Sequence, residues 1–242
     1  MSTLTIPVLI NHRGASAQAP ENTLAAVHKA AALGAQWLEF DVCLTRDNVA
    51  IVIHDNTVDR TTNGHGSVAK LTYNEIKTLD AGSWFADEFV GEQVTMLAQW
   101  LQTCAQYQLG LNLEMKSVGR RAAQLAQIVA AHLKEYWPAP LPVPLISSTS
   151  ISCLRAIKKI APQIPRGFIS DRWRIRWKKI TDQLDCATYN LNYHFLTPKR
   201  IEKIHATGRK VLAFTVLEKD VAQYLLEMGV DGLFVNDVLL LS

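Results

Sequence analysis

Two carboxylates stand two residues apart within a short apolar stretch of this chain. Residues 37–42 have the sequence WLEFDV, which is typical of a buried β-strand. Side chains two apart in a strand project from the same face, so Glu39 and Asp41 are expected to lie side by side. Adjacent buried carboxylates repel each other and lose hydration, which costs several kcal/mol per ion unless a cation or hydrogen-bond donors compensate. The pair therefore predicts a cation site.

A second stretch, GLNLEMK at 110–116, repeats this arrangement. Asn112, Glu114 and Lys116 share one face, and the apolar residues between them share the other. Glu114 is therefore a third candidate ligand. Three carboxylates with no cysteine or histidine among them suit a hard cation such as Mg²⁺, Ca²⁺ or Mn²⁺ better than Zn²⁺. Taken alone, each carboxylate is more simply explained by a salt bridge or by solvation, and Lys116 is an obvious partner for Glu114.

The elements that must position these residues alternate between strand and helix along the chain. Eight apolar stretches are predicted strands: 8–12, 37–42, 111–115, 145–148, 167–170, 187–191, 211–216 and 232–235. Helices are predicted between them at 21–34, 96–107, 120–136, 150–160, 173–184, 198–207 and 219–228. A single α/β barrel would use all 242 residues.

One further apolar strand, 49–54, does not fit this alternation. Only residues 45–48 separate it from the strand before, whereas a parallel neighbour needs a crossover of about a dozen residues. We expect a hairpin with Asp47 and Asn48 in its turn, which places His54 beside the second strand. The next segment, about 55–91, is too long for a plain loop, so we expect a small inserted subdomain with a short helix near 73–79.

The bulk composition excludes several classes of protein. A formal net charge of +3 is too mild to indicate binding to nucleic acid or adsorption to membranes. No signal peptide is predicted, and no apolar run reaches the roughly 18 residues of a membrane span. The 4 cysteines are scattered without a C-x-x-C pair, which indicates reduced, buried thiols. We therefore expect a cytoplasmic protein without stable membrane insertion, while its oligomeric state is not predicted.

Six short motifs follow one another along the chain. They are His12-Arg13-Gly14, Pro20-Glu21-Asn22-Thr23, Glu39-Phe40-Asp41, His54-Asp55, Asp80-Ala81-Gly82-Ser83-Trp84 and Glu114-Met115-Lys116. Their order resembles that of the glycerophosphodiester phosphodiesterase family, in particular its short cytosolic bacterial members. Each motif is weak alone, but six in order over nearly the whole chain are a specific signal. One departure lies near the end, where the chain has Val235-Asn236 and the family tends to have Thr-Asp.

The resemblance implies a fold, a reaction and a cofactor. The fold is an α/β, distorted TIM (β/α)8 barrel, a single domain over residues 1–242 with an insertion at about 55–91 after the second strand. The reaction is metal-dependent hydrolysis of glycerophosphodiesters, deacylated phospholipids such as glycerophosphocholine and glycerophosphoethanolamine, to sn-glycerol 3-phosphate and an alcohol. One divalent cation is implied, Mg²⁺ or Ca²⁺, with Mn²⁺ as a further candidate. The small-molecule substrate is the implied partner, and nucleic acid is not.

The resemblance also implies roles for single residues. Carried over position by position, it assigns Glu39, Asp41 and Glu114 to the cation, His12 and His54 to acid/base catalysis, and Arg13 and Lys116 to the phosphate. A barrel independently places these residues at the carboxyl ends of its strands or in adjoining loops, where barrel enzymes keep their active sites. A lone histidine at a strand end is usually structural, but its combination with Arg13 and the carboxylates favours catalysis.

Three further residues are candidates for contact with the substrate: Glu21, Trp84 and Phe214. Glu21 has the alternative role of an acid in the first turn of a helix, where the helix dipole favours it. Trp84 belongs to the insertion, which would cover one side of the pocket at the glycerol end of the substrate, or would only pack against the barrel. Phe214 begins the sequence Phe-Thr-Val-Leu, where the family tends to have Trp-Thr-Val-Asn.

Several alternatives stay open at this point. The same site would serve a lysophospholipase D, which would favour an apolar tunnel or a membrane anchor, or a catalytically silent barrel that binds phosphodiesters. The attacking group is either water or the 2-hydroxyl of the substrate's glycerol, and either histidine is a candidate for the acid. The basic, aromatic segment 173–179 is interpreted as an amphipathic helix with solvated charges.

Overall fold

The computed structural model describes residues 4–117, 119 and 121–242. Residues 1–3 lie outside the described residues, and they belong to the N-terminal stretch in which no signal peptide is predicted. Arg120, at which one predicted helix begins, lies outside them as well. Among the helices that the structure describes, none is long and apolar enough to cross a membrane.

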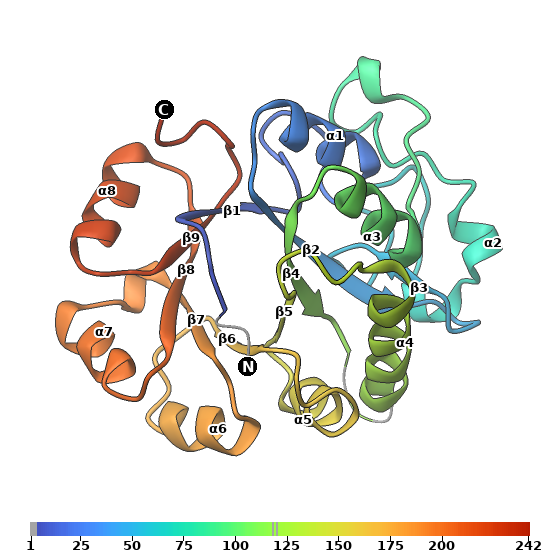
Figure 1. Cartoon of the computed structure of the whole chain (residues 1–242). Helices are drawn as coiled ribbons and strands as arrows, with labels where there is room; N and C mark the ends of the chain where they lie inside the picture. Colours follow the sequence, from blue (N-terminus) through green and yellow to red (C-terminus); the bar gives the residue numbers. More distant parts are fainter. Residues whose placement is uncertain (1–3, 118, 120) are drawn as a thin grey trace.

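Eight parallel strands form a closed barrel with helices on its outside (Figure 1). In order around the barrel they are β1 (Leu9–His12), β2 (Trp37–Leu44), β4 (Gly110–Met115), β5 (Leu145–Ser148), β6 (Arg166–Ser170), β7 (Thr188–Asn192), β8 (Lys210–Val216) and β9 (Gly232–Val235). Strand β1 closes the ring because it pairs with both β2 and β9, with His12 opposite Glu39 and Asn11 opposite Val235. The predicted TIM (β/α)8 barrel is therefore confirmed.

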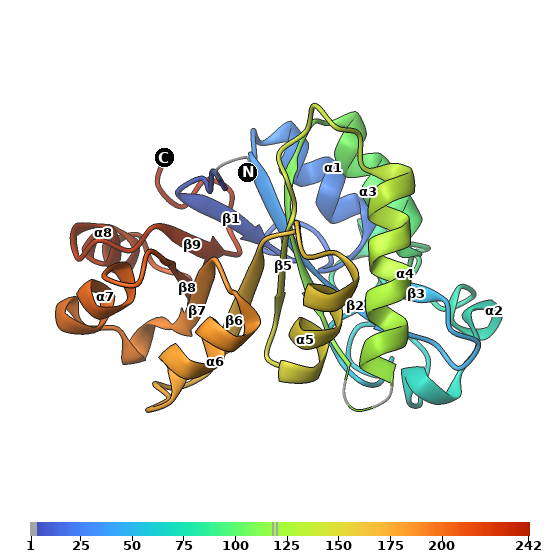
Figure 2. The ribbon, with the colours of Figure 1, turned by 60° about the horizontal axis from the view of Figure 1, so that its bottom comes forward.

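The helices around the barrel lie where the alternating pattern predicted them, with two differences at their starts. They are α1 (Leu24–Ala32), α3 (Leu97–Gln106), α4 (Arg121–Tyr136), α5 (Ile151–Ile160), α6 (Trp177–Leu184), α7 (Pro198–His205) and α8 (Lys219–Glu227). The longest of them, α4, runs along the side of the barrel (Figure 2). Helix α1 starts later than predicted because the Thr23 hydroxyl oxygen caps it, accepting a hydrogen bond from the N–H of Ala26 at 3.3 Å.

The second difference concerns the basic segment ahead of α6. Its first four residues, 173–176, are not helical, so the prediction of one amphipathic helix over the whole segment is wrong. The Trp173 ring is held instead by tertiary contacts, with the Arg200 guanidinium carbon 4.8 Å from its centre and the Trp177 ring 5.6 Å away. These contacts fix an irregular loop where the periodicity alone favoured a helix.

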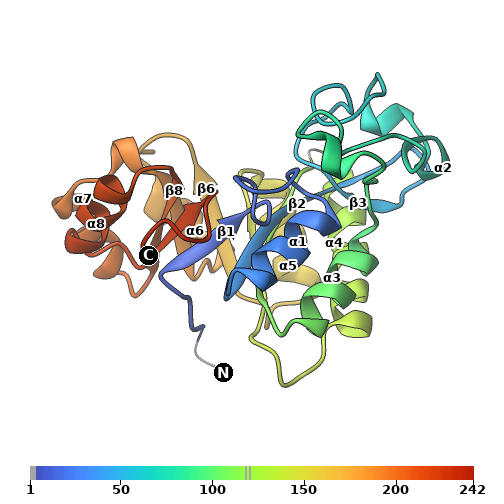
Figure 3. The same ribbon diagram turned by 90° about the horizontal axis from the view of Figure 1, so that it is seen from above.

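Strand β3 (Ala50–Val52) turns back antiparallel to β2, as the short spacing predicted. Asn48 in the turn has a φ of 65°, a left-handed conformation that asparagine tolerates. The chain then leaves the barrel for a segment that contains helix α2 (Tyr73–Ile76) and the 3-10 helices η1 (Val68–Lys70) and η2 (Asp87–Phe89). Figure 3 shows this segment to one side of the barrel, near β2 and β3.

The inserted segment has an apolar cluster of its own. Buried side chains such as Val68 and Ile76 pack there together with Ile51 of β3. Asp80 ties the segment together, because its carboxylate accepts hydrogen bonds from three backbone N–H groups, those of Gly82, Ser83 and Gly91, each at 2.8 Å. Gly82 is packed so closely that an added Cβ would lie 1.9 Å from the carbonyl oxygen of Phe89.

The two faces of β2 have different neighbours although all eight of its residues are buried. Its side chains at 38, 40, 42 and 44 pack into the core on the helix side, where the rings of Phe40 and Trp100 of α3 lie 4.7 Å apart. Glu39 and Asp41 alternate with these residues and therefore face the barrel interior. The register is fixed by this pattern, because a slip of one residue would bury both carboxylates against the helices.

Arg166, at the amino end of β6, binds several backbone groups at the amino-terminal end of the barrel strands. Its side chain is only 2% exposed, and its guanidinium donates hydrogen bonds to the backbone oxygens of Pro162, Ile164, Leu184 and Asp185 and to the Asp185 carboxylate. These bonds satisfy carbonyl oxygens that no strand or helix uses. Arg166 therefore contributes to stability at the end of the barrel opposite to the strand ends that carry the candidate catalytic residues.

Candidate active site

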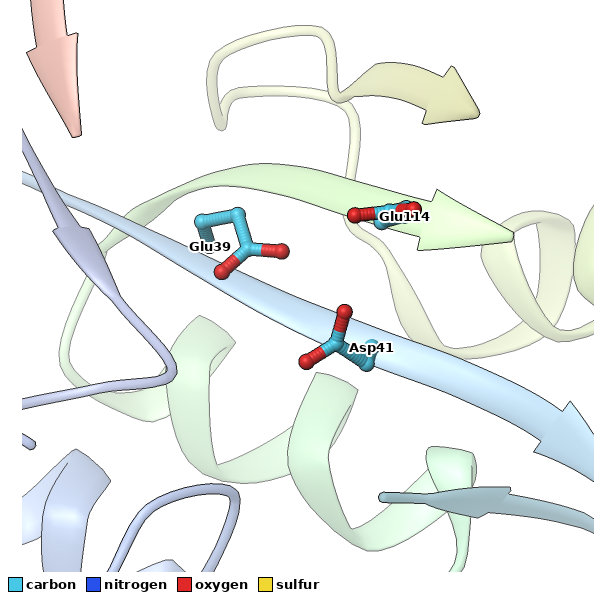
Figure 4. Close-up of side chains that lie close together, drawn as sticks. All are labelled: Glu39, Asp41 and Glu114. Carbon is cyan, nitrogen blue, oxygen red and sulfur yellow. The ribbon is translucent and has the colours of Figure 1, made fainter. Parts of the chain in front are cut away.

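The three predicted cation ligands meet in the barrel interior (Figure 4). Glu39 and Asp41 come from β2, and the register places Asp41 directly opposite Glu114 on β4. All three side chains are buried, and one carboxylate oxygen from each lies within 4.8 Å of the other two. We call these residues the acidic triad. Three converging oxygen donors of this kind form a group that could hold a hard divalent cation.

The electrostatics of the acidic triad favour a positive partner. Burial, and then the charges of Asp41 and Glu114, raise the pKa of Glu39 well above its usual range. Burial and the charge of Asp41 also raise the pKa of Glu114 to about 7. Burial acts on Asp41 in the same direction, but Lys116 and Arg13 outweigh it and hold the pKa of Asp41 below its usual value. Two of the three carboxyl groups therefore lack enough positive charge to ionise readily.

Two cationic side chains face the acidic triad. Lys116 Nζ lies 3.2 Å from Asp41 Oδ1 and 3.0 Å from Glu114 Oε1. Arg13 Nε lies 3.4 Å from Asp41 Oδ2, and the Arg13 backbone N–H donates a hydrogen bond to Glu39 Oε2 at 3.1 Å. This N–H can point at Glu39 because Arg13 adopts the left-handed conformation, with a φ of 58°. Both cationic side chains thus lie beside the acidic triad and line the same cavity.

The two candidate acid/base histidines line the same cavity from different elements. His12 ends β1, and its Nδ1 donates a hydrogen bond to Asn236 Oδ1 at 2.9 Å, which leaves Nε2 directed toward Glu39 Oε2 at 3.9 Å. Burial and the neighbouring Arg13 lower the pKa of His12 to about 4. His54 follows β3, and its Nδ1 lies 2.6 Å from Asp55 Oδ1. Each imidazole therefore has one nitrogen oriented by an oxygen acceptor.

The cavity has a volume of about 400 Å³ and two kinds of wall. Its lining includes the charged groups of the site, while Ile169, Phe214 and Phe234 contribute apolar surface. Asp171, at the start of the β6–α6 loop, adds a carboxylate outside the acidic triad. Phe214 lines this cavity, while its contact with the substrate stays a prediction.

Trp84 and Glu21, the other two predicted substrate contacts, do not line this cavity. Trp84 is 41% exposed, and its indole N–H donates a hydrogen bond to the backbone oxygen of Ala81 at 2.9 Å. Its contact with substrate stays a prediction. Glu21 precedes α1, so its alternative role in the first helical turn is wrong, because the chain at Asn22 takes a left-handed turn with a φ of 59° before Thr23 caps the helix.

The Glu21 carboxylate is instead held by two arginines. Arg13 Nη1 donates to Glu21 Oε1 at 2.6 Å, while Arg60 Nη1 donates to Oε2 and Arg60 Nη2 to Oε1, both at 2.8 Å. Both cations outweigh burial and hold the pKa of Glu21 below its usual value. Glu21 therefore supports the position of Arg13 from outside the cavity.

Three residues near the site were not singled out from the sequence. Asn22 donates a hydrogen bond to Asp41 Oδ2 at 2.9 Å, Asn236 accepts one from His12, and Arg60 pairs with Glu21. Asn22 belongs to the Pro20-Glu21-Asn22-Thr23 motif, and Asn236 stands where the chain departs from the family pattern. The sequence therefore offered a reason to consider both residues as part of the site. Arg60 lies in the insertion, where no periodicity or motif marked it.

Comparison with known proteins adds an independent line of support. The model of the glycerophosphoryl diester phosphodiesterase family matches residues 12–240. The glycerophosphodiester phosphodiesterase of Caldanaerobacter subterraneus subsp. tengcongensis is 34% identical over 230 residues, covering 95% of this chain and 94% of the relative. The glycerophosphodiester phosphodiesterase of Bacillus subtilis is 29% identical over 247 residues, covering 94% and 82%.

Solved structures agree with the sequence comparisons. A phosphodiesterase from Oleispira antarctica, in complex with the product sn-glycerol-3-phosphate, is 37% identical and superposes with a TM-score of 0.93 over 96% of this chain and 93% of that one. A glycerophosphodiester phosphodiesterase from Agrobacterium tumefaciens is 28% identical, with a TM-score of 0.78 over 96% of this chain and 97% of that one.

Proposed function

Because this chain belongs to the glycerophosphoryl diester phosphodiesterase family, we propose that it hydrolyses glycerophosphodiesters with the help of one divalent cation. The substrates are deacylated phospholipids such as glycerophosphocholine and glycerophosphoethanolamine, and the products are sn-glycerol 3-phosphate and an alcohol. The observation that carries the proposal is the acidic triad within 4.8 Å, in an interior whose cavity is also lined by two oriented histidines. Binding alone would need no acid/base pair, which argues against a silent barrel.

The cation proposed for the acidic triad is Mg²⁺, Ca²⁺ or Mn²⁺. The residues fit such an ion, because the donors are buried carboxylate oxygens and burial raises the pKa of Glu39 and Glu114, so that a positive charge beside them would favour their ionised forms. A bound cation would supply Lewis-acid stabilisation of the charge on the phosphate. Glu39, Asp41 and Glu114 would hold it.

The side chains of the chain itself supply the remaining steps. Arg13 and Lys116 bind the phosphate oxygens and offset the charge that grows in the transition state. One histidine takes the proton of the attacking oxygen, and the other protonates the departing alkoxide, since the unperturbed pKa of imidazole lies near neutrality. For His12 the reactive nitrogen is Nε2, because Nδ1 is occupied by Asn236.

The attacking oxygen belongs either to water or to the 2-hydroxyl of the glycerol. A diester whose glycerol 2-hydroxyl is methylated distinguishes the two routes. Direct attack by water predicts that this substrate is still cleaved, whereas attack by the 2-hydroxyl through a cyclic phosphate predicts that it is inert.

The test of the function is the release of sn-glycerol 3-phosphate from glycerophosphocholine. EDTA should abolish the release, and Mg²⁺, Ca²⁺ or Mn²⁺ should restore it. Glu39→Gln should behave like the chelated enzyme, and Glu227→Gln, an exposed acid on α8, is the matched control that should not. Full turnover by a metal-free preparation would refute the cation, and no release under any condition would refute the activity.

Two broader expectations go with this proposal. We infer that residues 1–242 work as one barrel domain and that the insertion at about 55–91 contributes to its active site. A location in the cytoplasm stays a prediction, which fractionation of cells would test. A lysophospholipase D would need room for an acyl chain, and no observation of the cavity of about 400 Å³ specifically favours one.

A further inference from the structure

Arg60, in the inserted segment, lies between two carboxylates that come from different parts of the chain. Its Nε and Nη2 donate to Asp55 Oδ2 and Oδ1 at 2.7 and 3.2 Å. Its Nη1 and Nη2 donate to Glu21 Oε2 and Oε1, both at 2.8 Å. The guanidinium therefore forms two bidentate pairs at once, the geometry in which arginine binds carboxylates most strongly and most specifically.

Each of these carboxylates continues to a residue of the proposed active site. Asp55 Oδ1 lies 2.6 Å from His54 Nδ1, so the path from Arg60 through Asp55 ends at an imidazole. Glu21 Oε1 accepts a hydrogen bond from Arg13 Nη1 at 2.6 Å, so the path through Glu21 ends at a guanidinium beside Asp41. The Arg60 side chain thus connects His54, proposed for proton transfer, with Arg13, proposed for phosphate binding.

The charges of the pairs support this connection. Hydrogen bonds from Arg60 are the main reason that the pKa of Asp55 lies far below its usual value. The hydrogen bonds that Arg60 donates to the carboxylates of Glu21 and Asp55 in turn raise the pKa of Arg60. Asp55 therefore stays ionised as an acceptor for His54, and Glu21 as an acceptor for Arg13. Supporting partners of this kind fix the orientation of the groups they bind, and where the supported group is a metal ligand the loss of one typically costs 10- to 100-fold in activity.

We propose that Arg60 is a positioning residue for the hydrolysis, orienting His54 through Asp55 and Arg13 through Glu21. The proposal rests on the proposed function of the cavity, and it extends the active site to a side chain that does not line it. The competing explanation is that Arg60 only fastens the inserted segment to the barrel. The two differ in what happens to kcat when the fold is intact.

The first test compares Arg60→Ala with a matched control, Arg46→Ala. Arg46 is also an exposed arginine near the insertion, but its carboxylate partner is Glu75, with Arg46 Nη2 3.4 Å from Glu75 Oε2 and both outside the cavity. Arg60→Ala should lower kcat for glycerophosphocholine by about 10- to 100-fold and raise KM, because both His54 and Arg13 lose their support. Arg46→Ala should keep both constants within about twofold of the wild type.

Two further measurements separate positioning from folding. The affinity for Mn²⁺, measured by titration calorimetry, should be unchanged in Arg60→Ala, because Arg60 makes no contact with the acidic triad. Arg60→Lys should recover part of the lost kcat, since an ammonium group keeps the charge and donates single hydrogen bonds but reproduces neither bidentate pair. The proposal would be overturned if kcat falls in proportion to the melting temperature across the variants and Arg60→Lys has no higher kcat than Arg60→Ala.

A double-mutant cycle tests the path itself. If Arg60 acts through Asp55, then adding Arg60→Ala to Asp55→Asn should cost much less than Arg60→Ala costs in the wild type. If the losses in kcat from the two substitutions multiply fully, the path through Asp55 would be overturned. A second cycle, with Glu21→Gln in place of Asp55→Asn, tests the path through Glu21 in the same way. Release of sn-glycerol 3-phosphate by the wild type is checked first, so failure of the proposed function is recognised separately from failure of this inference.

Discussion

Glu114 makes the metal-free protein sensitive to pH in a direction that the structure fixes. In the folded chain its pKa is about 7, compared with 4.5 for a free glutamate. Between these values the folded protein holds a proton that the unfolded chain has already released. Glu114 therefore stabilises the folded protein more at acidic pH, and its contribution to the free energy of unfolding falls as the pH rises.

The size of the effect follows from the two pKa values. Each unit of difference corresponds to about 1.4 kcal/mol, so between pH 5 and pH 8 this one carboxyl group should remove roughly 2 to 3 kcal/mol of stability. Glu114→Gln places a neutral amide of nearly the same shape at this position. In EDTA, the variant should therefore gain roughly 2 to 3 kcal/mol on the wild type as the pH is raised from 5 to 8.

The measurement is urea denaturation in EDTA at both pH values, for the wild type, for Glu114→Gln and for Glu227→Gln. The comparison between variants is needed because His12, whose pKa is lowered to about 4, changes the stability of all three proteins in the opposite direction. Adding Ca²⁺ at pH 8 should stabilise the wild type by about 2.7 kcal/mol at a hundredfold excess over Kd, and Glu114→Gln by less.

One result would refute this reasoning. If the stability difference between Glu114→Gln and the wild type is the same at pH 5 and pH 8, then Glu114 ionises equally in the folded and unfolded chains. Glu227→Gln, at an exposed position on α8, is the control for any general effect of replacing a glutamate.

Three further predictions address catalysis and stability. His12→Ala and His54→Ala should each lower kcat by about 10²- to 10⁴-fold in a folded protein, and steady-state kinetics with near-normal kcat would remove that histidine from the mechanism. Arg166→Leu should lower the melting temperature by roughly 10 °C, because buried carbonyl oxygens lose their donors at about 1 to 3 kcal/mol each; an unchanged calorimetric transition would contradict this. Gly82→Ala should speed limited proteolysis of residues 55–91, since its Cβ would lie 1.9 Å from the Phe89 carbonyl oxygen, and unchanged cleavage would show that the contact relaxes freely.

Much of the fold follows from local patterns that the sequence displays directly. Eight strand patterns alternate with seven helix patterns, and the five residues between β2 and β3 allow only an antiparallel turn. Alternation within a strand also placed Glu39 beside Asp41 and predicted the face of Glu114. These predictions succeeded because each depends on neighbours a few residues apart.

The parts that could not be predicted depend on contacts between distant segments. Arg60 meets Glu21 across 39 residues, and His12 meets Asn236 across 224. The start of α6 was wrong for a related reason, because the Arg200 side chain of another helix holds Trp173 outside it. No local period carries information about such partners, and only the closed barrel brings them together.

The bond between His12 and Asn236 spans the seam at which the barrel closes. The acidic triad does not depend on that seam, because the pairing of β2 with β4 brings its three residues together. The partner of His12 arrives only with the residues that follow β9. The imidazole of His12 is therefore held by this acceptor only when the ring of strands is complete, whereas His54 takes its acceptor from the next residue of the chain.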